Sequence, residues 1–189
     1  KTNAVWMAHE WVQIPQSKEK IHSLLSELIG NDISLVFLHT GPIEENGIIP
    51  PSRYPEAKNF LTTARMFAPD IKFHAWIGQT RDPLPIENPE VRQNIIKDAM
   101  HLVKDVDFDG IHINIEPMQS DPDFASLLKE MDGEFEKNAI TAEISAAVSP
   151  IVPGMYLKAL KLVYGDKFFG HDLNRTYSGF KYTKELAKN

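Results

Sequence analysis

The order of hydrophobic patterns along the chain predicts an α/β fold, a (β/α) barrel of the TIM type that is incomplete and holds about five to six β/α units. Five short apolar runs typical of buried strands alternate with longer segments whose apolar residues recur at helical spacing. This alternation favours a parallel sheet built from right-handed crossovers, and a doubly wound open sheet is the main alternative. Connections from strand to helix are long and rich in turn residues, so we expect a binding site at the carboxyl ends of the strands.

Each element is predicted from its own residues. We expect strands at residues 4–12, 33–40, 71–78, 108–117 and 140–148. The first helix begins after Ser17, a typical N-cap residue, and ends near Gly30. The second helix covers residues 54–67. The third begins at Asn88 with Pro89 in its first position, and the fourth covers residues 120–137.

The chain of 189 residues predicts a single barrel-type domain, residues 1–189, with an atypical C-terminal tail from 151 to 189. Residues 1–150 hold 13 Lys and Arg against 23 Asp and Glu, whereas residues 151–189 hold 7 against 3. The tail has room for a short helix at 154–164 and one strand at 167–173. Because a full barrel typically needs about 250 residues, we expect a fragment, or an incomplete barrel whose open sheet edge is closed by a homo-oligomer.

Composition excludes several classes of partner. No apolar run approaches the roughly 20 residues of a membrane helix, so we expect no membrane span. A net charge of −6 without a basic, aromatic-rich face argues against nucleic acid. The absence of cysteine excludes disulfides and cysteine catalysis. The chain begins at Lys1 rather than Met, which slightly favours a secreted or cell-surface protein whose leader has been removed.

The segment from Phe108 to Pro117 is the most informative one. Side chains alternate across a strand, so His112, Asn114 and Glu116 share one face and the intervening isoleucines share the other. Polar groups aimed at an enclosed interior are costly unless they are hydrogen-bonded or do chemistry. Glu116 stands at the strand end, before Pro117, which predicts a functional carboxylate; a polar network in the sheet core is the alternative.

This segment resembles the fourth barrel strand of the chitinase-type glycoside hydrolases, family 18, which reads Asp-Gly-x-Asp-x-Asp-x-Glu and ends in the catalytic acid. Asp109, Gly110 and Glu116 match, whereas His112 and Asn114 replace the two middle aspartates. Residues 71–78 are similar to the third strand of that family. The resemblance covers about residues 4–150, and its specific part is 108–117.

The resemblance implies a retaining glycosidase that acts on a β-linked glycan, one that could contain N-acetylglucosamine, with Glu116 as general acid and no cofactor. His112, Asn114 and Asp109 complete the catalytic set. The substrate's acetamido carbonyl would attack the anomeric carbon, and Asn114 would orient it without supplying the usual negative charge. We therefore expect weak hydrolysis, a different reaction or none. If Glu143 faces inward, it is a candidate second carboxylate.

Aromatic and polar side chains near the strand ends suit a carbohydrate ligand, because aromatic faces stack on sugar rings. Those expected to contact it are Trp11, Trp76, His74, His39, Glu10 and Glu143, whereas Trp6 is expected in the core.

Two other classes of function remain open. A non-catalytic carbohydrate-binding protein would keep the groove without the chemistry. A metal-dependent hydrolase would use His9, His39, His74 and His112, one on each of the first four strands, but no paired metal-binding motif accompanies them, and we expect no metal.

Overall fold

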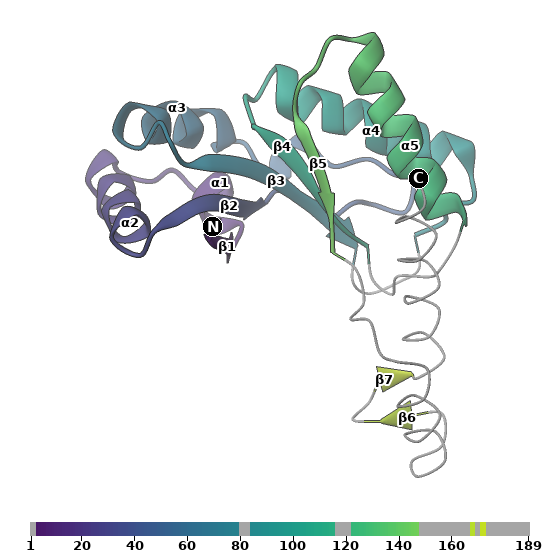
Figure 1. Ribbon diagram of the computed structural model, residues 1–189, viewed down its shortest axis with the longest axis horizontal. Helices are drawn as coiled ribbons and strands as arrows, with labels where there is room; N and C mark the ends of the chain where they lie inside the picture. Colours follow the sequence, from purple (N-terminus) through teal and green to yellow (C-terminus); the bar gives the residue numbers. More distant parts are fainter. Residues whose placement is uncertain (1–2, 80–83, 116–121, 148–166, 169–170, 173–189) are drawn as a thin grey trace.

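The computed structural model describes residues 3–79, 84–115, 122–147, 167–168 and 171–172. Five strands form one parallel sheet in sequence order, as Figure 1 shows. The strands are β1 (Asn3–Met7), β2 (Ile33–His39), β3 (Lys72–Gln79), β4 (Gly110–Ile115) and β5 (Glu143–Ala146). The predicted α/β class and the parallel sheet are confirmed, and β1 and β5 are the edges of this sheet.

Four longer helices alternate with the strands and pack on one side of the sheet (Figure 1). They are α2 (Lys18–Gly30), α3 (Ala57–Phe67), α4 (Pro89–Lys104) and α5 (Pro122–Lys137). Two predicted N-caps are confirmed: the Ser17 hydroxyl accepts the Lys20 N–H at 3.2 Å, and the Asn88 amide oxygen accepts the Glu90 N–H at 3.0 Å. The first part of the fourth predicted helix, residues 120–121, lies outside the described residues.

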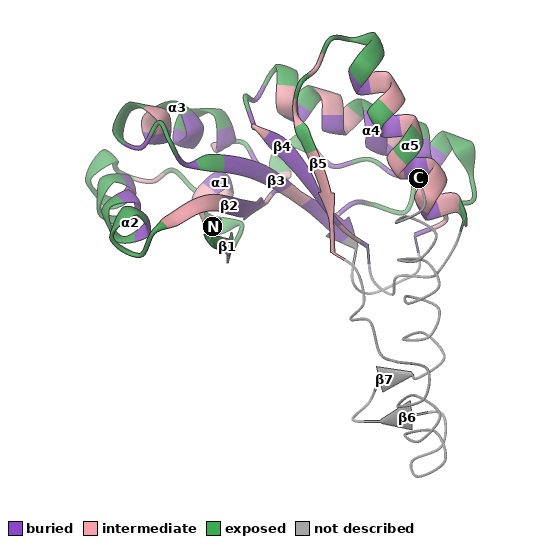
Figure 2. Ribbon diagram, viewed as in Figure 1, coloured by how far each residue is buried: buried purple, intermediate pink, exposed green. Residues whose placement is uncertain are grey.

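The hydrophobic core lies between the sheet and these helices. Alternate strand residues on the helix side are completely buried, among them Val36, Phe73, Ile77, Ile111 and Ile113. Figure 2 shows this buried layer in purple, with exposed residues on the outer surfaces of the helices. Because the isoleucines of β4 all face the helices, its other side chains must face the opposite side of the sheet, here called the interior face.

The first predicted strand is too long. The chain leaves the sheet after Met7, and a short helix, α1 (Glu10–Gln13), follows. Val12 is buried, and its carbonyl accepts the Glu56 N–H at 2.8 Å. The short apolar pattern of residues 4–12 suits a strand and one helical turn equally, and tertiary packing selects the turn.

Other boundaries and burials also differ from the predictions. A short 3-10 helix, η1 (Pro51–Arg53), precedes α3. The fifth strand is confined to Glu143–Ala146. Trp6, expected in the core, is 55% exposed, because it lies at the open edge of the interior face rather than under the helices.

The tail gives two short strands in place of one. β6 (Lys167–Phe168) pairs antiparallel with β7 (His171–Asp172), whereas one strand was predicted at 167–173. The helix predicted at 154–164 lies outside the described residues. Within the described part of the chain, no helix combines the length and hydrophobicity required to cross a membrane.

Candidate functional site

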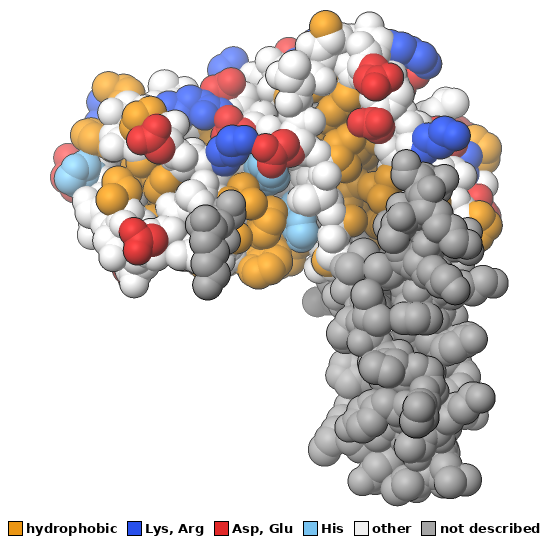
Figure 3. Space-filling model, in the orientation of Figure 1, with side chains coloured by type: hydrophobic (Ala, Val, Ile, Leu, Met, Phe, Trp, Pro, Cys, Tyr) orange, Lys and Arg blue, Asp and Glu red, His pale blue; other side chains and the backbone are white. Residues whose placement is uncertain are grey.

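Strand register arranges the interior face in rows that cross the sheet. The row that includes the first residues of β4 and β5 contains Trp6, Phe37, His74, Gly110 and Glu143. The next row contains His39, Trp76, His112 and Ser145, and the row nearest the carboxyl ends includes Gly78 and Asn114. In Figure 3, hydrophobic and histidine side chains lie together near the middle of the molecule.

Gly78 lets β3 and β4 pair closely at the carboxyl end. A Cβ atom at this position would lie 1.9 Å from the Asn114 carbonyl oxygen, so only glycine fits. The Asn114 side chain is half-buried, and its Oδ1 is buried without a hydrogen-bond partner among the described residues. A buried amide oxygen without a partner is an exception in folded proteins and calls for a structural or functional explanation.

His112 is held by contacts on two sides. Its ring stacks on Phe37, with centroids 4.0 Å apart and planes inclined by 27°, and its Nδ1 lies 2.9 Å from the Ser145 Oγ. Burial, and secondarily the charge of His74, lowers the pKa of His112 to about 4. The ring is therefore neutral at neutral pH, so the position adds no charge to the site.

His74 is still more buried, with 1% of its surface exposed. Gly110 makes room for it, since a Cβ there would approach the ring to 2.8 Å. Burial lowers the pKa of His74, and the nearby carboxylates of Glu143 and Asp109 oppose this effect. His74, predicted to contact substrate, lies one row closer to the amino ends than Trp76 and His112.

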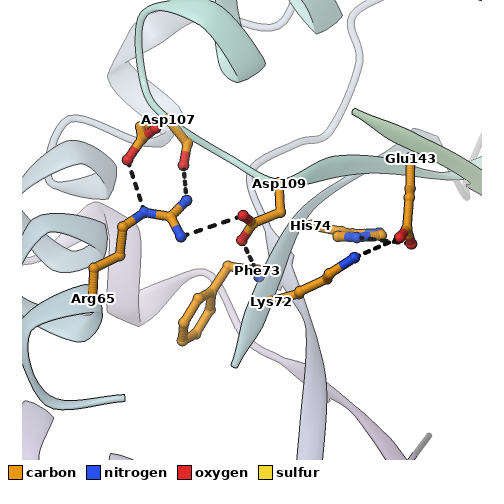
Figure 4. Close-up of polar contacts among 7 residues, drawn as sticks. All are labelled: Arg65, Lys72, Phe73, His74, Asp107, Asp109 and Glu143. Carbon is orange, nitrogen blue, oxygen red and sulfur yellow. Dashed lines mark hydrogen bonds and ion pairs between the residues drawn. The ribbon is translucent and has the colours of Figure 1, made fainter. Parts of the chain in front are cut away.

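Asp109 directly precedes Gly110, the first residue of β4, and so lies at the amino end of this strand. Its Oδ2 accepts the Phe73 N–H at 2.8 Å, and its Oδ1 lies 3.3 Å from the Arg65 guanidinium, which also binds Asp107 (Figure 4). The five residue steps from Gly110 to Ile115 span about 16 Å. The Asp109 carboxylate thus connects α3 to β3 and β4 at the amino end of the strands, and membership of Asp109 in the catalytic set stays a prediction.

Glu143 also lies at the amino end. It pairs in register with Gly110, and its carboxylate accepts a hydrogen bond from Lys72 at 2.6 Å and lies 3.7 Å from His74 (Figure 4). The Lys72 hydrogen bond lowers the pKa of Glu143. A two-carboxylate glycosidase separates its groups by about 5–9.5 Å, whereas the register separates Glu143 from the carboxyl end of β4 by more than this. The expected role of Glu143 as second carboxylate or substrate contact is therefore not supported.

An aromatic group lies nearer the carboxyl ends. The half-buried rings of His39 and Trp76 meet edge to face, with centroids 4.7 Å apart, and the centroids of the His9 and His39 rings are 6.0 Å apart. Burial lowers the pKa of His39, and His9 and Arg53 lower it further. Neutral imidazole and indole rings offer an apolar surface with polar edges, which suits a sugar.

Trp11 and Glu10 are not on a strand. Both belong to α1, and Glu10 is exposed. The Trp11 ring lies 6.1 Å from Phe60 of α3 and beneath the Lys20 ammonium at 5.0 Å. The structure thus places Trp11 in the helical layer, and the shortened first strand is the reason.

No three His, Cys, Asp or Glu side chains in the described ranges come together as a metal-binding group. The four-histidine hypothesis assumed that each strand carries one histidine. His9 instead lies beyond the end of β1, at the N-cap position of α1, and Trp76 separates His39 from His112 in their row.

Glu116 lies outside the described residues, and it follows Ile115, the last residue of β4. Of the other site predictions, the structure brings Asn114, His112, Trp76 and His39 to neighbouring positions of the interior face. The sequence analysis assigned no role to Phe37 or Ser145. Their alternation with apolar strand residues, Val36 and Leu38 in β2 and Ile144 and Ala146 in β5, was the available signal.

Comparison with known proteins identifies the family. Residues 17–168 match the glycosyl hydrolases family 18, so the chain belongs to this family. Comparison with curated protein sequences gives no match.

Several solved structures share the fold. The class V chitinase from Nicotiana tobaccum is 20% identical with a TM-score of 0.59, over 80% of this chain and 46% of that one. A class V chitinase mutant from Cycas revoluta in complex with (GlcNAc)3 is 17% identical with a TM-score of 0.61, over 80% and 48%. The Group IV chitinase from Ostrinia furnacalis is 18% identical with a TM-score of 0.58, over 78% and 44%. This chain therefore spans about half the length of the chitinases it matches, and the predicted TIM-barrel-like α/β fold is confirmed.

Proposed function

We propose that the carboxyl-end part of the interior face binds a β-linked glycan containing N-acetylglucosamine and that Glu116 acts as general acid in its hydrolysis. The observation that carries this proposal is the position of Asn114. Its Oδ1, which has no hydrogen-bond partner in the described part of the chain, lies on the interior face in the row nearest the carboxyl ends, and Asn114 stands two residues before Glu116 in the sequence. Active sites of (β/α) barrels lie at that end of the strands.

The neighbouring rings supply the remaining features of a sugar site. Trp76 and His39 offer half-buried aromatic surface in the adjoining row. Family membership and the chitinases that share the fold, one of them in complex with (GlcNAc)3, support a chitin-type ligand.

Replacement of the acid tests the catalytic half of the proposal. Glu116→Gln keeps the shape of the side chain and removes its proton, so hydrolysis of N-acetylglucosamine oligomers should fall by about 10²- to 10⁴-fold, whereas binding measured by calorimetry should change little. Glu143→Gln is the matched control, because Glu143 lies at the amino end, and it should retain wild-type turnover. Equal turnover of Glu116→Gln and wild type would exclude Glu116 as the acid.

A carbohydrate-binding protein without hydrolysis is the second candidate, and one specific observation favours it. Glu143 is the sole Asp or Glu within strands β1 to β5, and Lys72 binds it at the amino end. Asn114 and the neutral His112 therefore leave these strands without a carboxylate that could stabilise a cationic intermediate. Oligomer binding with no turnover in the wild type would support this candidate.

Self-association is a further proposal about the whole chain. The two edge strands, β1 and β5, have unpaired backbone groups on one side of the described sheet, and such edges favour pairing with another chain. Light scattering coupled to size exclusion would detect it, and a monomer at all concentrations would contradict it.

A further inference from the structure

Ser145 connects β5 to β4 on the interior face. It lies directly opposite His112 in the strand register, and its Oγ is 2.9 Å from the His112 Nδ1 and 3.4 Å from the Ile111 carbonyl oxygen. Because a hydroxyl has one proton, it can donate to only one of these two acceptors.

The count of hydrogen bonds distinguishes the two arrangements. If the Nδ1–H of His112 donates to Oγ, then Oγ–H donates to the Ile111 carbonyl, and both hydrogen bonds form. If Oγ–H instead donates to Nδ1, the contact with Ile111 is lost and the proton moves to Nε2. That atom is buried without a hydrogen-bond partner among the described residues. An unpaired buried N–H group is rarer than an under-satisfied acceptor, so the first arrangement is favoured.

The His112 ring cannot easily escape this geometry. It is 5% exposed, it stacks on Phe37, and the Trp6 ring approaches its edge with centroids 5.9 Å apart. The rotamer is therefore fixed by packing, and Ser145 decides which nitrogen carries the proton.

We propose that Ser145 is a positioning residue that holds His112 as the Nδ1–H tautomer, and that the unprotonated Nε2 accepts a hydrogen bond from a hydroxyl or amide N–H of the bound glycan. The second part rests on the proposed function. Among the described residues, the His112 Nε2 and the Asn114 Oδ1 have no hydrogen-bond partner, and they lie in adjacent rows of β4, so donors of one ligand can satisfy both. Hydroxyl and amide groups of an N-acetylated sugar are such donors.

Long-range ¹H–¹⁵N correlation NMR of the full chain at neutral pH tests the tautomer without any ligand. The wild type should show a protonated Nδ1 and an unprotonated Nε2 for His112. Ser145→Ala should lose this single tautomer, and Ser145→Thr, which keeps the hydroxyl, should restore it. Ser126→Ala is the control, since the Ser126 hydroxyl bonds the Pro122 carbonyl within α5 and should leave the His112 spectrum unchanged. A protonated Nε2 in the wild type would overturn the proposal.

Titration with an N-acetylglucosamine tetramer tests the second part. The His112 Nε2 resonance should shift on binding, and Ser145→Ala should weaken binding by about fivefold, the effect of one neutral hydrogen bond, while Ser145→Thr stays near wild type. Binding without a shift at Nε2 would overturn the ligand contact and leave the proposed function standing. Absence of binding with the expected tautomer would refute the proposed function and the ligand contact together, and would leave the role of Ser145 intact.

Discussion

Removal of the His112 imidazole should make the protein more resistant to acid. In the folded protein the pKa of His112 is lowered to about 4 by burial, whereas an unfolded chain titrates near 6.5. As the pH falls below about 6.5, His112 is therefore protonated in the unfolded state and stays neutral in the folded state, so the free energy of unfolding decreases. The loss continues until the pH reaches the folded pKa.

The magnitude follows from the two pKa values. Between about pH 7.5 and pH 5, this one group should reduce the free energy of unfolding by about 2 kcal/mol, and by about 3 kcal/mol near pH 4. In His112→Gln this contribution is absent. Burial also lowers the pKa values of His74 and His39, so these residues contribute to the acid sensitivity of both proteins. The contribution of His112 is therefore read from the difference between wild type and variant.

Urea unfolding at the two pH values measures this difference. Ile113→Val is the control, because it removes one methylene from the opposite, helix-facing side of β4 and keeps the imidazole. It should lower stability by about 1 kcal/mol equally at both pH values. The reasoning is refuted if His112→Gln and wild type lose the same stability on acidification.

Two further predictions concern the third and fourth strands. Gly78→Ala should lower the free energy of unfolding by about 3 kcal/mol, because the added Cβ would overlap the Asn114 carbonyl. Gly133→Ala in α5 is the control: nothing lies within 4 Å of the added Cβ, so this variant should raise the free energy of unfolding by about 0.5–1 kcal/mol. Equal effects of the two substitutions in urea unfolding would contradict the close approach of β3 and β4. Asn114→Asp should create or increase hydrolysis of N-acetylglucosamine oligomers, since it supplies a carboxylate near the developing cation; if this variant, alone or combined with His112→Asp, folds and binds oligomer without hydrolysis, the resemblance marks ancestry alone.

Much of the fold was predictable because local signals agree with the final packing. Ser17 and Asn88 cap helices where expected, and the alternation in β4 correctly separates Ile111 and Ile113 from His112 and Asn114. The prediction failed where a short pattern suited two structures, as at Trp11. Trp11 was predicted near the end of the first strand, whereas the structure places it in the helix α1.

The position of each interior residue along the strand axis, between the amino and carboxyl ends of the sheet, was harder to predict than the face on which it lies. Alternation gives the face of a strand but not the height at which neighbouring strands pair. Glu143 therefore seemed a candidate second carboxylate, and the register places it beside Gly110 and Lys72 at the amino end. For Asp109, the family motif gave no indication that the carboxylate binds Arg65 and the Phe73 N–H.

The central claim is that a glycan binds on the interior face at the carboxyl ends of β3 and β4. Calorimetric titration of the full chain with an N-acetylglucosamine tetramer tests it most directly, comparing Trp76→Ala with Lys72→Met on the same strand. Trp76→Ala should weaken binding by about tenfold, as expected for loss of one aromatic contact, and Lys72→Met, at the amino end, should bind as the wild type does. The account is contradicted if the wild type shows no binding, or if Lys72→Met loses affinity while Trp76→Ala keeps it.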